Sequence, residues 1–296
     1  MRLLDKVRHR VTRARQHRWR VRPHTSTARH VIIGGSPRSG TTLLRRTFDR
    51  HPGLCCGPES SLFLPVRIAI GPLAAGHGIA QEELRAMLAA SPSQGAFVDA
   101  FAARYQALRG RPRWAEKTPL NVRHLDWIMA RWPDARIVHV VRDGRDVVCS
   151  MREHPDRRWV DGRWVRELDP RPVEEYARRW VADTSAGMRW RGDPRYLEVR
   201  YEDLVHAPEV TLAAVLAFLG EPYDPALLAI DAPAAGSAGM PAASAARGGR
   251  PDAAGTITTA SMGRWQRDLV GTDRASVKAI SGARLIELGY ATGQDW

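Results

Sequence analysis

The sequence has no long hydrophobic run, and this absence limits what the chain can be. No stretch of its 296 residues approaches the ~20 uninterrupted apolar residues that a helix needs to span a bilayer. The first 30 residues also lack the apolar core and small-residue cleavage site of a secretory signal. We therefore expect neither a membrane-spanning protein nor export by that route.

Cysteine is scarce as well. The three thiols, Cys55, Cys56 and Cys149, are odd in number and have no metal-type spacing. This pattern argues against both a disulfide framework and a zinc site. Reduced thiols, a cytoplasmic location and a site without metal are expected.

Positive charge is concentrated at the N terminus. The formal net charge is +13, and residues 1–30, with ten basic residues against Asp5 alone, account for +9 of it. The remainder is only mildly basic, which suits a site for small polyanions better than a surface for a long duplex. No nucleic acid partner is expected.

The basic segment and the rest of the chain are expected to behave differently. Residues 1–28 are expected to form a flexible, solvated arm and residues 29–296 a single domain. The alternative for the arm is weak docking on an anionic membrane surface through a short apolar helical face, formed by Leu3, Leu4, Val7 and Val11. Residues 231–260, rich in Ala, Gly, Pro and Ser, are expected to form a mobile loop or lid. Nothing in the sequence indicates an oligomeric state.

The order of strand and helix signals predicts an α/β fold. The β-branched run 30–33 ends in two glycines and leads into a helix over about 41–51, and the run 136–141 leads into a helix from Asp143. Strand followed by helix, twice, indicates parallel pairing with right-handed crossovers. We expect a three-layer fold, a central parallel sheet flanked by helices. Further helices are expected at 81–109, 121–132, 172–190, 208–219 and 275–288, and a strand at 196–199.

The first strand-to-helix turn has the composition of a phosphate-binding loop. Residues 34–42, G-G-S-P-R-S-G-T-T, present backbone N–H groups at a helix N-terminus, where the macrodipole favours anions. Gly35 and Gly40 have the spacing of the ATP-binding loop, but Thr41 stands where its lysine would be, and Arg38 is the only cation. A donor with a sulfated 5′-phosphate presents no triphosphate and needs no Mg²⁺. The loop therefore favours such a donor over ATP.

Two segments together resemble a known family. The loop and residues 51–59, H-P-G-L-C-C-G-P-E, resemble the N-terminal half of sulfotransferases that use 3′-phosphoadenosine 5′-phosphosulfate (PAPS), above all the tyrosylprotein sulfotransferase branch and its bacterial relatives. That branch has P-R-S-G-T-T-L, then H-P and C-G-x-E, at these spacings. The resemblance covers about residues 30–220 and returns at 263–265 and 288–290. It implies a P-loop-like fold, PAPS as donor, 3′-phosphoadenosine 5′-phosphate (PAP) as product, and a hydroxyl acceptor.

The resemblance also assigns donor-binding residues. In the second signature, residues 140–151, Arg142 leaves a strand and Ser150 lies about two helical turns further on, and in the family these two positions hold the 3′-phosphate. The alternative is an ordinary charged turn in which Asp143 or Asp146 caps the helix. The remaining donor-binding positions are Arg38, Ser39, Gly40, Thr41 and Thr42 in the loop, Tyr201 beside the nucleotide, and Arg264 closing over the phosphate.

Three residues are predicted to carry the chemistry. Glu59 matches the family's catalytic glutamate and is the candidate base; a turn cap or an ion pair with an arginine is the alternative. Arg38 and Lys117 are expected to stabilise charge on the sulfuryl group and the leaving phosphate. Lys117 lies in W-A-E-K-T-P, which resembles the family's K-x-P segment, and its alternative is a solvated surface lysine.

Two other functions share parts of this pattern. A small-molecule P-loop kinase has the same fold but requires the missing lysine. A nucleic-acid or membrane adaptor with a degenerate loop explains the basic arm but leaves Arg142, Ser150 and Lys117 without a role. The acceptor is not encoded in a readable motif: a small molecule, sugar, lipid or tyrosine peptide all fit, and Trp159 and Trp164 are the aromatic candidates for contacting it.

Overall fold

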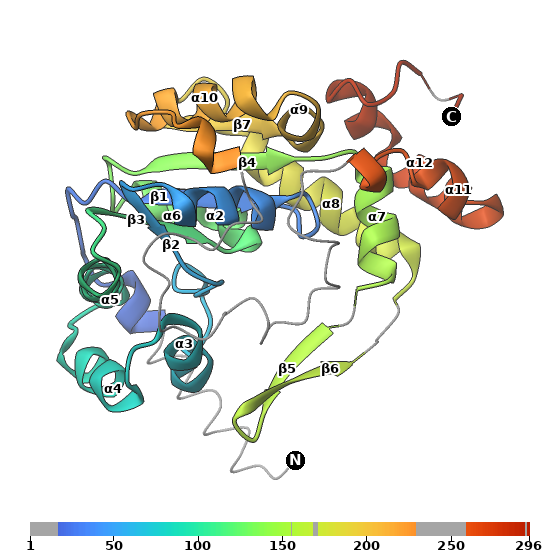
Figure 1. Ribbon diagram of the computed structural model, residues 1–296. Helices are drawn as coiled ribbons and strands as arrows, with labels where there is room; N and C mark the ends of the chain where they lie inside the picture. Colours follow the sequence, from blue (N-terminus) through green and yellow to red (C-terminus); the bar gives the residue numbers. More distant parts are fainter. Residues whose placement is uncertain (1–16, 155, 168–170, 229–258, 294) are drawn as a thin grey trace, which may run out of the picture.

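The central element of the fold is a parallel β-sheet. The computed structural model describes residues 17–154, 156–167, 171–228, 259–293 and 295–296 (Figure 1). Its five-stranded sheet has the order β2-β3-β1-β4-β7, with every neighbouring pair parallel. The strands are β1 (Val31–Gly35), β2 (Leu54–Cys56), β3 (Arg113–Lys117), β4 (Arg136–Val141) and β7 (Tyr196–Arg200).

Helices cover both faces of this sheet. In Figure 1, α2 (Thr41–Arg50), α9 (Tyr201–His206) and α10 (Pro208–Leu219) lie on one face. The opposite face is covered by α5 (Gln94–Arg109), the 3₁₀ helix η1 (Pro119–His124), α6 (Leu125–Met129) and α8 (Val173–Met188). The other helices are α3 (Ile70–His77), α4 (Gln81–Ala90), α7 (Gly144–Arg152), η2 (Pro225–Leu228), η3 (Thr259–Ser261), α11 (Trp265–Asp268) and α12 (Gly271–Glu287). The α/β, three-layer prediction is confirmed.

Alternate strand residues enter two separate cores, which is why β1 and β4 are almost continuously apolar. Ile32, Cys55 and Ile137 pack with α5 and α6 in one cluster. Their neighbours Ile33 and Val138 pack with α2 and α10 in another. Successive side chains of a strand point to opposite faces, so a sheet buried on both sides needs apolar residues at nearly every position.

Parallel pairing places the ends of the strands at one edge of the sheet. β1 pairs with both β3 and β4, as the strand-helix pattern predicted for β4. Because the carboxyl ends of parallel strands share an edge, the segments after Gly35, Cys56, Lys117 and Val141 meet there. Every segment that the sequence singled out for chemistry leaves the sheet at this edge or lies just beyond it.

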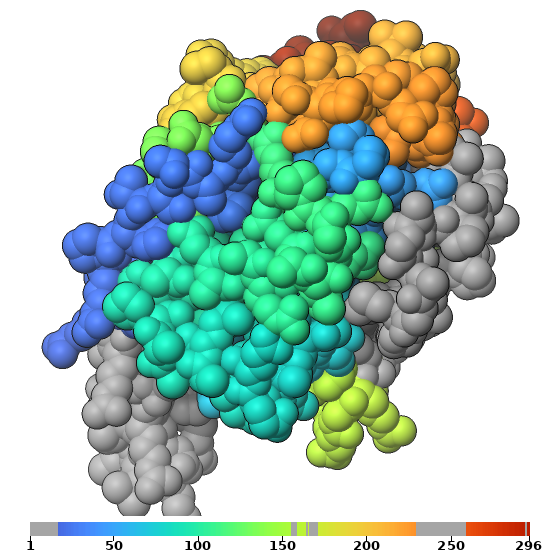
Figure 2. Space-filling model, turned by 60° about the vertical axis from the view of Figure 1, so that its left-hand side comes forward, coloured from blue at the N-terminus to red at the C-terminus, as the bar shows by residue number. Residues whose placement is uncertain are grey.

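The structure corrects some predicted elements. The single helix over 81–109 is wrong: Pro92 interrupts it, and Ser93 caps the new helix α5 by accepting a hydrogen bond from Ala96 N. Strands β2 and β3 were not predicted, because neither has a β-branched run. Residues 156–167 form an antiparallel hairpin, β5 (Asp156–Val160) with β6 (Arg163–Glu167), which projects from the body of the molecule (Figure 2).

The described part of the basic segment contacts the domain. Trp19 Nε1 donates to Ser91 O over 3.1 Å, and the Arg20 guanidinium lies 3.9 Å above the ring of Trp127. His24 Nε2 is 2.8 Å from an Asp99 oxygen. The first 16 residues of the predicted arm, and the predicted lid except for residues 259–260, lie outside the described residues. No helix in the described ranges is long and apolar enough to span a bilayer.

Candidate active site

The loop between β1 and α2 adopts a conformation that its glycines permit. Gly40 caps α2 with φ 94°, and Arg38 has φ 74°. A side chain at Gly40 would place its Cβ 2.3 Å from Cδ2 of Tyr201, so the tyrosine ring packs directly on the loop backbone. The loop therefore turns sharply beneath an aromatic ring and directs backbone N–H groups along the axis of α2.

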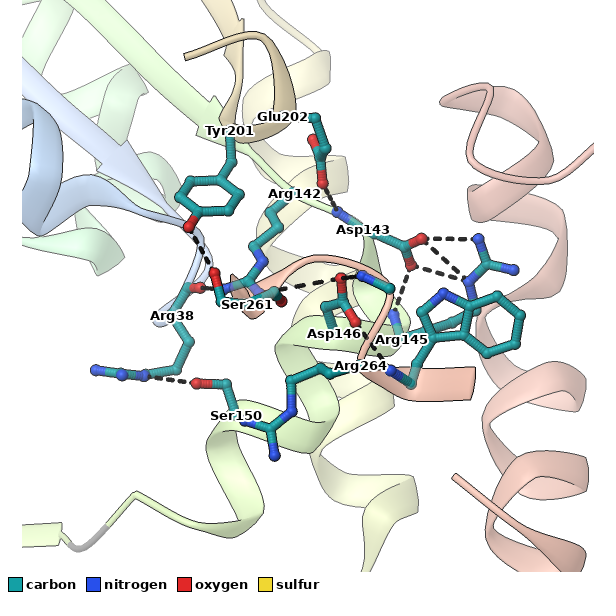
Figure 3. Close-up of polar contacts among 12 residues, drawn as sticks. Arg38, Arg142, Asp143, Arg145, Asp146, Ser150, Tyr201, Glu202, Ser261 and Arg264 are labelled. Atoms are coloured by element: carbon teal, nitrogen blue, oxygen red, sulfur yellow. Dashed lines mark hydrogen bonds and ion pairs between the residues drawn. The ribbon is translucent and has the colours of Figure 1, made fainter. Parts of the chain in front are cut away.

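The second corner, at the end of β4, lies against this loop. Nη1 of the buried Arg142 donates to the carbonyl of Arg38 over 3.0 Å. In return, Arg38 Nε donates to Ser150 Oγ over 3.0 Å, as Figure 3 shows. Arg38, Arg142 and Ser150, from two corners about 100 residues apart in the chain, thus form one cluster.

Tyr201 and a late segment of the chain complete this cluster. The Arg142 guanidinium lies 4.5 Å from the centre of the Tyr201 ring, and the Tyr201 hydroxyl is 2.6 Å from Ser261 Oγ. Arg142 Nη2 also donates to the carbonyl of Ser261. The sequence assigned no role to Ser261, since it follows a segment of low complexity that carries no motif.

Asp146 ties the late segment to α7. Its buried carboxylate accepts from Gly263 N over 2.8 Å and from Trp265 N over 3.0 Å (Figure 3). One of its oxygens lies 4.0 Å from Arg142 Nη2. Burial raises the pKa of Asp146, while the two backbone donors and Arg142 act in the opposite direction. Asp146 is therefore a tertiary link rather than a helix cap.

Asp143, in contrast, does cap α7. Its carboxylate accepts a hydrogen bond from the backbone N of Arg145 over 2.9 Å. It also forms an ion pair with the Arg145 guanidinium over 2.7 Å. Its own amide donates to Glu202 Oε1 over 3.0 Å. These contacts hold the corner that carries Arg142 from both sides.

Arg264 lies on the late segment but binds other partners. Its guanidinium forms ion pairs with Glu153 over 2.5 Å and with Asp268 over 2.6 Å. Two carboxylates therefore neutralise its charge, unlike that of Arg142, which faces backbone carbonyls and one more distant carboxylate.

The predicted catalytic residues meet at the end of β3. Lys117 Nζ is 2.5 Å from Glu59 Oε1 and 3.5 Å from Thr42 Oγ1, the second residue of α2. The Lys117 side chain is 5% exposed and that of Glu59 42% exposed. Lys117 is thus buried rather than a solvated surface lysine, and Glu59 combines an ion pair with access from solvent.

Two buried polar atoms in the loop region suit an anionic ligand. Ser39 Oγ and Arg142 Nε have no hydrogen-bond partner among the described residues. Both are donors, and they lie beside the N-terminus of α2 with the buried Thr41. This donor set fits phosphate oxygens. Within the described ranges, no three His, Cys, Asp or Glu side chains gather as a metal site would require.

Comparisons by sequence show to which family the chain belongs. The model of the sulfotransferase family matches residues 30–225. A protein-tyrosine sulfotransferase of Drosophila melanogaster is 28% identical over 207 residues, which cover 67% of this chain and 39% of that protein. Protein-tyrosine sulfotransferase 1 of Danio rerio is 27% identical, with 67% of this chain and 55% of the relative covered. The chain thus matches about half or less of the length of these relatives.

Solved structures show the same fold. The sulfotransferase domain of the Synechococcus PCC 7002 olefin synthase has a TM-score of 0.56 at 24% identity, over 90% of this chain and 98% of that domain. The sulfotransferase domain from the curacin biosynthetic pathway has a TM-score of 0.57 at 20% identity, over 88% and 98%. These similarities are similarities of fold.

Proposed function

Because this chain belongs to the sulfotransferase family, we propose that it moves a sulfuryl group from PAPS to an acceptor hydroxyl and releases PAP. The observation that carries the proposal is the contact between the two corners. Arg142 donates to the Arg38 carbonyl and Arg38 to Ser150, so one nucleotide with a phosphate at each end can reach both. The sequence pattern required this proximity.

The donor would be held by residues from three segments. Loop residues Ser39, Gly40 and Thr41, at the N-terminus of α2, would bind the 5′-phosphate end. Arg142 and Ser150 would bind the 3′-phosphate, and the ring of Tyr201 would cover the nucleotide. PAPS supplies the activated sulfuryl group, and these side chains orient it.

The proposed transfer uses the cluster at the end of β3. Glu59 accepts the proton of the acceptor hydroxyl. At the same time the hydroxyl oxygen bonds to sulfur, and the bond from sulfur to the phosphate oxygen of the donor breaks. Lys117 and Arg38 stabilise the negative charge that develops on the sulfuryl and leaving phosphate oxygens, a contribution of roughly 3–4 kcal/mol for each such donor. The ion pair with Lys117 orients the Glu59 carboxylate before the acceptor arrives.

A tyrosine hydroxyl is the first acceptor to test. The two relatives described above carry the name protein-tyrosine sulfotransferase, and Glu59 is 42% exposed, so that an acceptor hydroxyl can approach it from solvent. Sugars, lipids and small phenols form the rest of the panel.

The test has two stages. Calorimetric titration should show PAP binding, and PAPS turnover should continue in the presence of a chelator because the proposed transfer uses Lys117 and Arg38, and no metal ion, to stabilise the developing charge. A protein that binds ATP with Mg²⁺ but not PAP would be a kinase. A protein that binds neither nucleotide, and binds anionic vesicles or nucleic acid only while residues 1–28 are present, would be an adaptor.

A further inference from the structure

A buried carboxylate next to Lys117 organises the loop that carries Glu59. Glu116 is 2% exposed and lies on β3, one residue before Lys117. Its oxygens accept hydrogen bonds from the amide and the hydroxyl of Ser60 (3.2 and 2.7 Å), the hydroxyl of Thr118 (2.6 Å) and the side-chain amide of Asn121. Ser60 immediately follows Glu59, so Glu116 holds the backbone next to the proposed base.

The hydrogen bonds around Glu116 suit an ionised carboxylate. The Ser60 hydroxyl accepts from Leu62 N over 3.2 Å and the Thr118 hydroxyl accepts from Ser61 N over 3.1 Å, so each can direct its proton to Glu116. Every partner of the carboxylate is then a donor, and a protonated acid would need an acceptor. Burial raises the pKa of Glu116, and the donors from Thr118, Asn121 and Ser60 oppose that shift.

The loop itself needs such support. Ser61 has φ 57°, a left-handed conformation that costs energy for a residue other than glycine. Its amide is held by Thr118, and Leu62 and Leu64 are held through their carbonyls by the side chain of Gln94, over 2.7 and 3.1 Å. Glu59 and Lys117 meet at one end of this network, since each is the direct neighbour of a residue within it.

We propose that Glu116 is a positioning residue for the reaction: it fixes Ser60 and Ser61 so that the Glu59 carboxylate lies against Lys117. This inference rests on the proposed role of Glu59. Two groups of residues at the sheet edge then have different roles: Glu116 supports the transfer step, and the Arg142 cluster binds the donor.

The primary test is Glu116→Ala. Without the carboxylate that accepts hydrogen bonds from Ser60 and Thr118, the loop should loosen. The value of kcat should then fall by about 100-fold, the effect expected when a catalytic group is misplaced by ~1 Å. The Kd for PAP should stay unchanged. Turnover is measured as PAP release from PAPS with a tyrosine-containing peptide and, in parallel, with water as acceptor. Hydrogen exchange should accelerate in the peptide covering residues 57–64 and not in the loop 36–42.

Two control variants define the cause. In Glu116→Gln, Oε1 can accept from Ser60 and Thr118. Asn121 Nδ2 faces Glu116 in the structure, so the Asn121 amide turns over to present Oδ1, which has no partner among the described residues, to the new amide. This variant should therefore recover most of the lost kcat. Asp99→Ala removes a half-buried carboxylate at the other end of the sheet, which binds His30 and Trp132. It should lower the melting temperature and leave kcat unchanged.

A double-mutant cycle with Glu59→Gln decides whether Glu116 acts through Glu59. Glu116→Ala should add little to the loss already caused by Glu59→Gln. An equal loss in both backgrounds, an unchanged kcat in Glu116→Ala, or a parallel loss of PAP affinity would each overturn the inference. Full activity of Glu59→Gln would instead overturn the proposed base. If Glu116→Ala does not fold, Ser60→Ala with Thr118→Val must show the same split between kcat and PAP affinity.

Discussion

At the scale of single residues, Arg142 is the side chain on which donor binding should depend most. It is buried and contacts the loop, Tyr201 and Ser261. Arg142→Ala should weaken PAP binding by about 10- to 100-fold, because a hydrogen bond to a charged group contributes roughly 1.5–3 kcal/mol. Calorimetry measures the effect, with Arg191→Ala, which breaks an ion pair to Glu198, as a control. Wild-type affinity in Arg142→Ala would refute its role.

Glu59 should show the opposite pattern. Glu59→Gln keeps the size of the side chain but removes the base, so turnover should fall by about 100- to 10,000-fold. PAP affinity should be retained, since Glu59 contacts Lys117 at the end of β3 and is not one of the residues assigned to the donor phosphates. Glu82→Gln, on the exposed face of α4, serves as the control. Unchanged turnover in Glu59→Gln would remove it as the base.

At the scale of elements, the join between the loop and α2 depends on Gly40. Gly40→Ala puts a methyl group 2.3 Å from the Tyr201 ring at φ 94°, whereas Gly110→Ala, at φ 59°, meets nothing within 4 Å. Both substitutions should lower stability because both strain the backbone. Only Gly40→Ala should also weaken PAP binding, because it displaces Tyr201. Equal PAP affinities in the two variants would show that the ring does not cover the donor site.

At the scale of the whole molecule, the free energy of unfolding should fall at acidic pH, because buried histidine side chains become protonated when the chain unfolds. Burial lowers the pKa of His139 to about 4 from 6.5, so the folded state excludes a proton that the unfolded chain binds. The stability contribution is complete above pH 6.5 and is lost by about 1.4 kcal/mol per pH unit as the pH falls toward 4. Burial likewise lowers the pKa of His124 to about 4, which adds to the loss.

The measurement is calorimetric unfolding between pH 4.5 and 7.5, within the window set by these pKa values. His139→Asn removes one titrating group and keeps a polar side chain beside Tyr196, the hydrogen-bond partner of His139. The variant should therefore lose stability less steeply with acid. The same slope in both proteins would assign the acid sensitivity to other groups.

The domain division, the cytoplasmic location and the role of the basic arm stay predictions at this scale. Residues 17–28 contact the domain through Trp19, Arg20 and His24, while the first 16 residues lie outside the described ranges. The assignment of individual residues to PAPS likewise stays a prediction, although Arg38, Arg142, Ser150 and Tyr201 form one cluster.

The amino-acid sequence by itself determined the β1–α2 and β4–α7 units, because apolar periodicity and glycine-bearing turns act over a few neighbouring residues. It did not reveal β2 and β3, which form strands because they pair with neighbouring strands of the sheet. Only the tertiary structure decided that Glu116 holds Ser60 and that Asp146 binds Gly263, partners 56 and 117 residues apart. Hydrogen bonds between distant segments leave no local pattern, since chain folding alone brings the donor and the acceptor together.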